Sequence, residues 1–316
     1  MGHRARDAAW AGAIQHGTQV AGFRRAHVPP GAGRLALAAV RAYFTKTWAA
    51  RHPGRPHRKG AQVRYIFSRL VKLVGVLVKL FCMVHLKLWP RARYTIPAYA
   101  PALVRRTGAR RVPRRVYQTN YAREVSLAVY LTWRFNRLMA WDHDFHYMDD
   151  AAAHDWVNAQ FPGEIAETYN RLQIGAAKAD YWRVLILMKD GGVYLDADAN
   201  FVWPPSKSIR DDEDELFLRM RDGEITNYFL ASAPGNRFMT GIEAEIRRNI
   251  AAGTETNIYL LTGPTAMLPA LAGGGFTLKS YRTICHQGQF MNERLQYPDR
   301  GHKKWWREQE ERSILR

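Results

Sequence analysis

Residues 175–205 read GAAKADYWRVLILMKDGGVYLDADANFVWPP, and this stretch is the most informative part of the sequence. Its segment Val184–Met188 is continuously apolar, which is typical of a helix buried against a sheet. The pair Gly191–Gly192 then supplies the left-handed backbone geometry that commonly ends a helix. A short apolar strand, Val193–Leu195, follows, and directly after it comes the Asp-Ala-Asp of residues 196–198. The stretch therefore predicts a helix, a glycine turn and a strand that ends in two carboxylates.

The two acids, Asp196 and Asp198, have a spacing that suits one metal ion. Side chains alternate between faces along a strand, so both carboxylates share a face if Val193–Ala199 stays extended. Carboxylate oxygens suit Mg²⁺ or Mn²⁺, which keep some waters and take phosphate oxygens as further ligands. Such an ion would stabilise the charge on a departing nucleoside diphosphate. A bare Asp-x-Asp also occurs as a solvated turn, so only the surrounding sequence can distinguish a metal site from such a turn.

The helix before the glycine turn carries two charged residues, Asp180 and Arg183. Residues three apart lie on one face of a helix, so these two side chains can act together. A buried helix with an acid and a base on one face, followed by a strand that ends in acids, is a defined arrangement. This context favours a site for a metal ion and a diphosphate over a solvated turn.

Further motifs flank this stretch, and all of them lie between residues 112 and 306. They are Val112–Thr119 (VPRRVYQT), Trp133, Asn136, His146–Asp150 (HYMDD), Asn227–Asn236 (NYFLASAPGN), Thr262–Pro264 (TGP), His302 and Trp305. In these residues the chain resembles glycosyltransferase family 32, which contains the Och-type α-mannosyltransferases. It is similar, more distantly, to the catalytic domain of the large clostridial glucosylating toxins.

The resemblance implies a retaining hexosyltransferase, for which mannose is one candidate sugar, with a GT-A-type α/β fold: a nucleotide-sugar-binding mixed sheet flanked by helices. It implies that Asp196 and Asp198 hold Mn²⁺ or Mg²⁺, with Asp198 the more direct ligand. The residues expected to bind the nucleoside-diphosphate sugar are Asp180, Arg183, Tyr194 and Asn227. An Asn at the start of a strand is also a common turn residue, so the role of Asn227 stays open. No catalytic base is assigned.

A histidine near the end of the chain is a candidate for a third metal ligand. His302 is one candidate, because the family has a late histidine and imidazole is an acceptable metal ligand. The alternative is a surface histidine in a basic tail, since Lys303 and Lys304 are adjacent. His286 is a second candidate for the same role.

Two positions depart from the family pattern. Asn120 stands where many relatives have an aromatic residue that can stack on the nucleobase, so the identity of the base is not predicted. Tyr117 replaces the more usual histidine of the opening strand. Neither position belongs to the metal pair.

The positive charge of the chain is confined to its first third. The net charge of the 316 residues is +19. Residues 1–115 contain 24 Lys/Arg and one acid, which gives +23, whereas residues 116–316 contain 23 Lys/Arg and 27 acids, which gives −4. This asymmetry indicates a basic segment attached to a mildly acidic domain rather than a uniformly basic protein.

Residues 63–89 form a strongly apolar stretch that basic residues interrupt, among them Arg69, Lys72 and Lys79. A central lysine is costly in a spanning helix, by about 2.5–3.5 kcal/mol. The pattern therefore favours a basic amphipathic helix on an anionic membrane surface, with Trp89 as an interfacial anchor. The alternatives are a surface helix docked on the domain by its apolar side and, third, a spanning anchor.

Three segments follow from these patterns. Residues 1–62 are a basic extension whose composition indicates disorder, residues 63–111 are the membrane-surface helix and a linker, and residues 112–316 are the GT-A glycosyltransferase domain. Two cysteines, Cys82 and Cys285, make a disulfide framework unexpected and favour a reducing compartment. No cleavable signal peptide is recognisable. The predicted location is peripheral on the cytoplasmic face of a membrane, and the predicted acceptor is a glycan or a lipid-linked molecule of polysaccharide biosynthesis.

Two other functions stay open. In a phosphohydrolase, Asp196 would be the nucleophile that forms an aspartyl phosphate, although such enzymes usually have Thr or Val where this chain has Asn200. The basic first third would instead suit a non-enzymatic protein that binds a membrane or another polyanion. Aromatic residues are not interleaved in a nucleic-acid-binding motif, so nucleic acid is not a predicted partner.

Overall fold

The structure, a computed structural model, describes residues 58–299 and 305–316. Its centre is a seven-stranded mixed sheet in the order β10-β8-β9-β6-β3-β5-β2. The strands are β2 (Tyr99–Ala100), β3 (Arg115–Asn120), β5 (Asp144–Asp149), β6 (Gly192–Leu195), β8 (Glu215–Arg219), β9 (Ile225–Ser232) and β10 (Leu278–Ser280). Strands β6, β3 and β5 run parallel, whereas β9 and β2 run antiparallel to their neighbours. The expected α/β fold, a mixed sheet flanked by helices, is confirmed.

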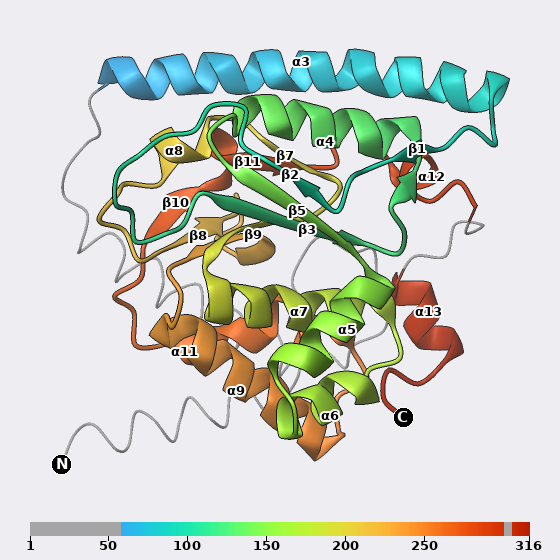
Figure 1. The fold of residues 1–316 in the computed structure, drawn as a ribbon, viewed down its shortest axis with the longest axis vertical. Helices are drawn as coiled ribbons and strands as arrows, with labels where there is room; N and C mark the ends of the chain where they lie inside the picture. The colour runs from blue at the N-terminus through green and yellow to red at the C-terminus, as the bar shows by residue number, and fades with distance from the viewer. Residues whose placement is uncertain (1–57, 300–304) are drawn as a thin grey trace.

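Helices cover both faces of this sheet (Figure 1). One face carries α3 (Arg58–Leu88) and α4 (Leu127–Met139). The other face carries α5 (Asp150–Gln160), α6 (Glu164–Arg171), α7 (Gly175–Asp190), α9 (Arg237–Ala252) and α11 (Leu268–Leu271). The shorter elements are α8 (Pro205–Ser208), α10 (Ile258–Leu261), η1 (Pro264–Met267), η2 (Tyr281–Thr283), α12 (Glu293–Gln296) and α13 (Trp305–Glu311). Two small strand pairs are β1 (Tyr94–Thr95) with β4 (Glu124–Val125), and β7 (Ala199–Phe201) with β11 (Cys285–Gln287).

The core consists of two apolar clusters, one on each face of the sheet. Strand β6 contributes to both, because Tyr194 packs into the cluster under α7 while Val193 and Leu195 pack into the opposite one. Every residue of β6 is buried. A strand covered on both faces reads as a continuous apolar run, which is how β6 appears in the sequence.

The glycine turn that joins α7 to β6 is confirmed. The φ angles of Gly191 and Gly192 are 62° and 117°, a region that favours glycine. A Cβ atom on Gly191 would lie 2.6 Å from Cδ of Pro234, and one on Gly192 would lie 2.9 Å from the carbonyl oxygen of Arg115. The turn therefore lies closer to Pro234 and to the start of β3 than any side chain on these two residues would permit.

The structure differs from the sequence-based expectations at the start of the helix that follows the basic extension. Helix α3 begins at Arg58, inside the segment expected to be a disordered extension, of which residues 1–57 lie outside the described residues. Helix α4 begins at Leu127, because Ser126 caps it by accepting a hydrogen bond from the Val129 N–H. The acidic run of residues 211–215 contains buried Glu213, whose Oε1 lies 2.7 Å from Nζ of Lys279.

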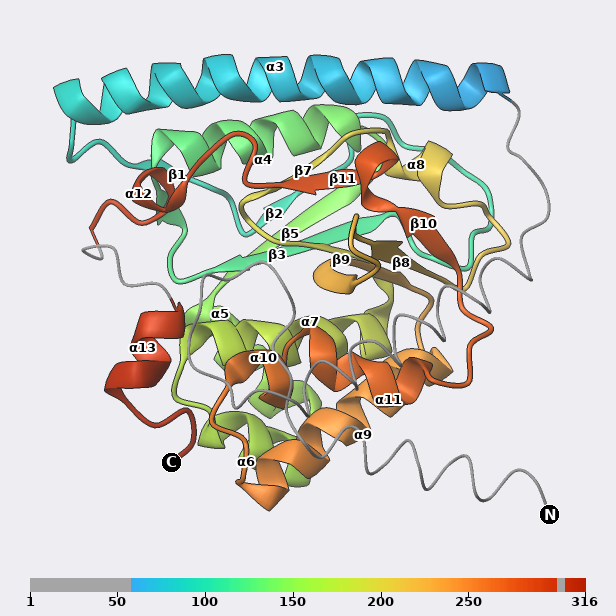
Figure 2. The same cartoon turned by 180° about the vertical axis from the view of Figure 1, so that it is seen from behind.

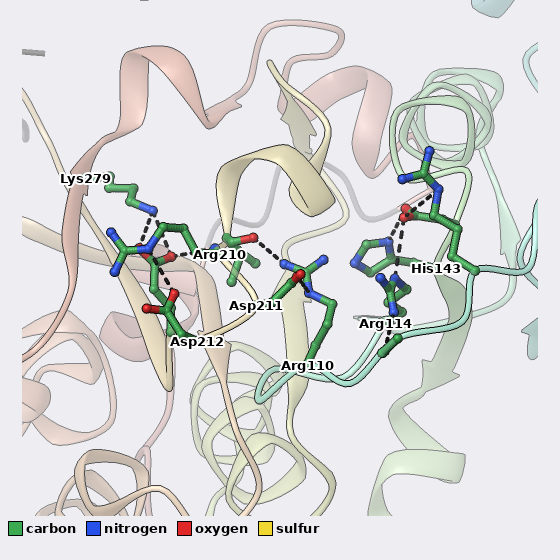
Figure 3. Close-up of polar contacts among 12 residues, drawn as sticks. Arg110, Arg114, His143, Arg210, Asp211, Asp212 and Lys279 are labelled. Carbon is green, nitrogen blue, oxygen red and sulfur yellow. Dashed lines mark hydrogen bonds and ion pairs between the residues drawn. The ribbon is translucent and has the colours of Figure 1, made fainter. Parts of the chain in front are cut away.

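Ion pairs fasten the loop before β3 to the neighbouring chain segments (Figure 3). Nε of Arg110 lies 2.8 Å from Oδ1 of Asp211, and Nε of Arg114 lies 3.6 Å from Oδ2 of Asp142. The Asp142 side chain is fully buried, and its Oδ1 lies 2.9 Å from Nδ1 of His143. This network fixes the loop that precedes β3, and it therefore also fixes the position at which β3 begins.

The buried Asp142 predicts a specific loss of stability in acid. Burial opposes its ionisation, but the hydrogen bond with His143 outweighs burial, and the pKa of Asp142 is lowered to about 2. A carboxylate with a lowered pKa stabilises the fold above its unfolded pKa, and this contribution is lost as pH falls from about 4 to about 2. Asp142→Asn should therefore cost about 2 kcal/mol of unfolding free energy at neutral pH and clearly less at acid pH, measured by urea unfolding. An equal loss at both pH values would contradict this role for the Asp142 charge.

Candidate functional site

The two acids of the Asp-Ala-Asp motif lie in a tight turn between β6 and β7. Strand β6 ends at Leu195, and the Ala199 N–H donates to the Asp196 carbonyl oxygen at 2.9 Å. The expectation that Val193–Ala199 stays extended is therefore wrong, and strand alternation does not bring the two carboxylates together. They converge nevertheless, because Nε2 of Gln287 donates to Oδ2 of Asp196 at 3.2 Å and to Oδ1 of Asp198 at 3.1 Å.

Gln287 reaches the acids because β11 pairs with β7 across the turn. The pairing is antiparallel and places Gln287 opposite Ala199 (Figure 2 shows the two strands on the side of the sheet that carries α3 and α4). Asn136 of α4 holds β7 from the other side, since its Nδ2 donates to the Ala199 carbonyl oxygen and its Oδ1 accepts from the Phe201 N–H, both at 2.9 Å. The turn is thus clamped by two amide side chains.

Arg183 links the helix α7 to the acidic turn. Its Nη2 lies 2.9 Å from Oδ1 of Asp180 and 3.3 Å from Oδ1 of Asp196. Its guanidinium lies over the ring of Tyr194, 4.5 Å from the centroid, and the Tyr194 hydroxyl donates to Oδ1 of Asp196 at 2.7 Å. The cation of Arg183 therefore pairs with one carboxylate from its own helix and one from the turn.

Asp180 is held by two further segments. Nδ2 of Asn227 donates to its Oδ1 at 2.9 Å, and the Thr262 hydroxyl donates to its Oδ2 at 3.3 Å. Nη1 of Arg183 donates to the Asn227 carbonyl oxygen at 2.7 Å, which fixes β9 to the same network. Asp180, Arg183, Tyr194 and Asn227, all expected at the donor site, thus form one connected network with Asp196.

The site carries more negative than positive charge, because three acids, Asp180, Asp196 and Asp198, meet one guanidinium. Burial raises the pKa of Asp180 to about 6 and, with the charge of Asp196, the pKa of Asp198 to about 7. Burial also raises the pKa of Asp196. Although burial works against its charge, Arg183 keeps a raised pKa, chiefly because of the Asp196 carboxylate. A divalent cation at the turn would compensate the excess negative charge.

The two carboxylates at the turn match the number of protein ligands that Mg²⁺ or Mn²⁺ commonly uses. Such ions commonly bind through one or two carboxylates and complete their shell with waters and substrate phosphates. Asp196 and Asp198 provide two carboxylates at a common point, and within residues 58–299 and 305–316 no group of three or more His, Cys, Asp or Glu side chains could hold a metal ion. The turn therefore fits an ion that shares its shell with a substrate.

Of the two histidines considered as a third metal ligand, the structure describes one. His302 lies outside the described residues. His286 is buried and faces α3, where its Nε2 lies 3.3 Å from the Ser68 hydroxyl. Burial and the charge of Lys72 lower its pKa to about 4. Because neighbouring residues of a strand face opposite sides, Gln287 points to the acids while His286 points away from them.

The positions that depart from the family pattern lie in or next to the core. Tyr117 is buried and packs on the ring of His146, with a centroid distance of 5.1 Å. Asn120 is buried at the carboxyl end of β3. Strands β3 and β6 are parallel, so Asn120 lies at the same edge of the sheet as the acidic turn.

Comparison with known proteins agrees with the geometry. Residues 129–216 match the family described as "Glycosyltransferase sugar-binding region containing DXD motif". The matched residues contain α7, β6 and the turn with Asp196 and Asp198, which is the Asp-x-Asp of this chain. The narrower likeness to the Och-type enzymes stays a prediction. No curated protein matches the chain.

Nine solved chains are similar to this chain, among them the following three. "PaToxG Glycosyltransferase" is 12% identical, with 66% of this chain and 80% of that chain covered and a TM-score of 0.38. The glycosyltransferase domain of the YGT toxin is 14% identical in its ligand-free and UDP-bound crystal structures, with TM-scores of 0.35 and 0.33. In both, 47% of this chain is covered, and the chain spans about half, 54%, of the length of that domain.

Proposed function

We propose that this protein is a metal-dependent glycosyltransferase that transfers a hexose from a nucleoside-diphosphate sugar. The observation that carries the proposal is the convergence of Asp196 and Asp198 on the single Nε2 atom of Gln287. Two half-buried carboxylates directed at one point, in a site with excess negative charge, favour a cation over a neutral ligand. The DXD region matched by residues 129–216 supports a sugar nucleotide as the molecule that shares this cation.

The side chains of the network have separate tasks in this proposal. Asp198 and Asp196 hold Mn²⁺ or Mg²⁺, which when bound neutralises the charge that develops on the leaving diphosphate. Arg183 fixes the carboxylate of Asp196 and adds positive charge beside the diphosphate. Asp180, held by Asn227 and Thr262, is an acceptor for hydroxyl groups of the ribose or the sugar. The Gln287 amide, which donates to both acids, would give up these two hydrogen bonds to a bound cation.

The reaction itself exchanges one bond of the anomeric carbon for another. The bond from this carbon to the diphosphate oxygen breaks, and a bond to the acceptor hydroxyl oxygen forms. The proton of the acceptor moves to the departing diphosphate, so the proposed retaining reaction needs no side chain as a base. Tight positioning and charge stabilisation then account for the acceleration.

The phosphohydrolase alternative fits the geometry less well. A nucleophilic carboxylate needs an oxygen free to attack phosphorus. Both oxygens of Asp196 accept hydrogen bonds, Oδ1 from Tyr194 and Oδ2 from Gln287, and Oδ1 is also paired with Arg183. These contacts lower the nucleophilicity of Asp196 and suit a carboxylate whose orientation matters more than its reactivity.

The proposal is tested by donor turnover in the full chain. Purified protein is incubated with a panel of nucleoside-diphosphate sugars, with Mn²⁺, with Mg²⁺ or with excess chelator, and released nucleoside diphosphate is measured. We expect release from one nucleotide class, which depends on the metal and returns when metal is added back after chelation. Release of inorganic phosphate instead, with a phosphoryl group trapped on Asp196, would favour the phosphohydrolase. A folded protein that turns over no donor would contradict the proposed function.

A further inference from the structure

Helix α3 presents an apolar face to the solvent. It lies across the molecule on the far side of α4 from the sheet (Figures 1 and 2). Of the eighteen exposed large apolar side chains among the described residues, thirteen belong to this helix. They are Val63, Tyr65, Ile66, Leu70, Leu73, Val74, Val76, Leu77, Leu80, Phe81, Met83, Val84 and Leu88. An apolar face of this size that is exposed to water indicates an interaction site.

The opposite face of α3 is the one that packs on the protein. Buried residues of the helix, among them Val71, Gly75 and Cys82, follow the spacing of one helical face. Leu73 and Leu77, by contrast, are 58% and 59% exposed and lie on the opposite face. Most apolar side chains of α3 therefore point away from the domain. This arrangement differs from the alternative in which the helix is docked on the domain by its apolar side.

The charge of α3 identifies the kind of surface that it fits. The helix contains seven Lys/Arg and no acid in its 31 residues, which correspond to a length of about 46 Å. Arg69 and Lys87 are exposed beside the apolar face, and Trp89 follows the helix and is 57% exposed. A long straight face with apolar and basic side chains and an aromatic residue at its end suits a flat anionic surface. Within the described residues, no helix combines the length and apolarity that crossing a bilayer requires.

We propose that the outer face of α3 docks the protein on an anionic lipid bilayer. Two other occupants would bring like charges together. A second copy packed on the same face would oppose two helices that each carry seven basic residues and no acid. Residues 1–57 of this chain contain nine Lys/Arg and one acid, so their sequence is also poorly matched in charge to α3.

The inner face of α3 connects this surface to the donor site. The Ser68 hydroxyl lies 3.3 Å from Nε2 of His286, and Nζ of Lys79 donates to the Gly288 carbonyl oxygen at 3.0 Å. A Cβ atom on Gly75 would lie 2.9 Å from the Gln289 carbonyl oxygen, so backbone and helix are in close contact there. Helix α3 thus holds the residues on both sides of Gln287, whose amide contacts Asp196 and Asp198.

This connection extends the proposed function, on which it rests, to the class of acceptor. A bilayer under α3 would hold the donor site at a fixed place next to the lipid headgroups, because α3 packs on the segment that carries Gln287. An acceptor anchored in the same bilayer would be concentrated at this site without any added contact. We infer that the acceptor is a membrane-anchored molecule, such as a lipid-linked sugar, rather than a freely diffusing one.

The docking surface is tested by co-sedimentation of the full chain with vesicles. Phosphatidylcholine vesicles with and without phosphatidylglycerol are compared for the wild type and for the double variant Leu73→Glu/Leu77→Glu, whose positions are exposed, so that the fold is retained. We expect wild-type binding that needs the anionic lipid and weakens with salt, and binding by the double variant that is about 100-fold weaker. Arg248→Glu is the matched control, because it changes the net charge equally on α9, on the other side of the sheet.

Three results would overturn the inference. They are equal binding by the double variant and the wild type, no binding of the wild type to anionic vesicles, and a dimer in light scattering that the double variant disrupts. Release of nucleoside diphosphate from the donor in free solution should be unchanged in the double variant. That readout separates the two proposals, since a failure of the donor site would abolish this release in the wild type, whereas a failure of docking would leave it intact.

Discussion

Asp198→Asn is expected to lower the rate of donor turnover by about 10³-fold while the folded protein becomes more stable. A bound cation supplies several kcal/mol of charge stabilisation, and each 1.4 kcal/mol or so corresponds to a factor of ten in rate. The amide keeps the shape of the carboxylate but removes the charge that we propose binds the metal. Burial and the neighbouring Asp196 raise the pKa of Asp198 to about 7, so the folded state disfavours its charged form. Above that pH, the neutral amide should therefore stabilise the metal-free protein by about 1–2 kcal/mol.

The two readouts are steady-state turnover of the donor and urea unfolding of the metal-free protein. Asp155→Asn is the control, because it removes one negative charge at a side chain that is 82% exposed and lies on α5, outside the acidic network. It should leave both quantities nearly unchanged. Turnover by Asp198→Asn within a few-fold of the wild type would show that Asp198 does not hold the metal.

Arg183→Met is expected to have the largest effect on stability, a loss of about 3–5 kcal/mol of unfolding free energy. Methionine fills much of the space but leaves Asp180 and Asp196 without their shared cation. Removing one partner of a buried ion pair is costly because the remaining charge has lost its water and its counter-ion. Arg183→Lys keeps the charge but not the planar fork, so it should lose less.

The pH dependence of this loss identifies its cause. In Arg183→Met the pKa values of Asp180 and Asp196 should rise further above their unfolded values. A carboxyl group with a raised pKa is destabilising when ionised, and the penalty disappears as pH falls below the folded pKa. The stability difference between wild type and variant should therefore shrink from pH 8 to pH 5. A difference below about 1 kcal/mol, or one that does not change with pH, would mean that packing rather than charge explains the role of Arg183.

The parts of the fold that the sequence predicts well depend on local patterns. Helix α7, the Gly191–Gly192 turn and strand β6 follow one another in the chain, and each has its own signal in composition and periodicity. The shared face of Asp180 and Arg183 is likewise a local property, since a helix fixes it over three residues. These features determine where the candidate site lies in the sheet.

The parts that the sequence does not reveal depend on contacts between distant residues. Gln287 meets the acids through the pairing of β11 with β7, whose partners are more than eighty residues apart in the chain, and no local pattern marks it. The tight turn at Asp196 depends on a backbone hydrogen bond that a strand-like composition conceals. For α3, the apolar periodicity predicts an amphipathic helix, but only the packed structure reveals that most of the apolar side chains face the solvent.

The most direct test of the donor site is calorimetric titration of the full chain with the nucleoside diphosphate of the preferred donor, with and without Mn²⁺. Wild-type protein should bind the nucleotide tightly only when Mn²⁺ is present, and Asp198→Asn should lose this dependence together with most of the affinity. Binding of equal strength with and without Mn²⁺, unchanged by Asp198→Asn, would contradict a metal site at Asp196 and Asp198.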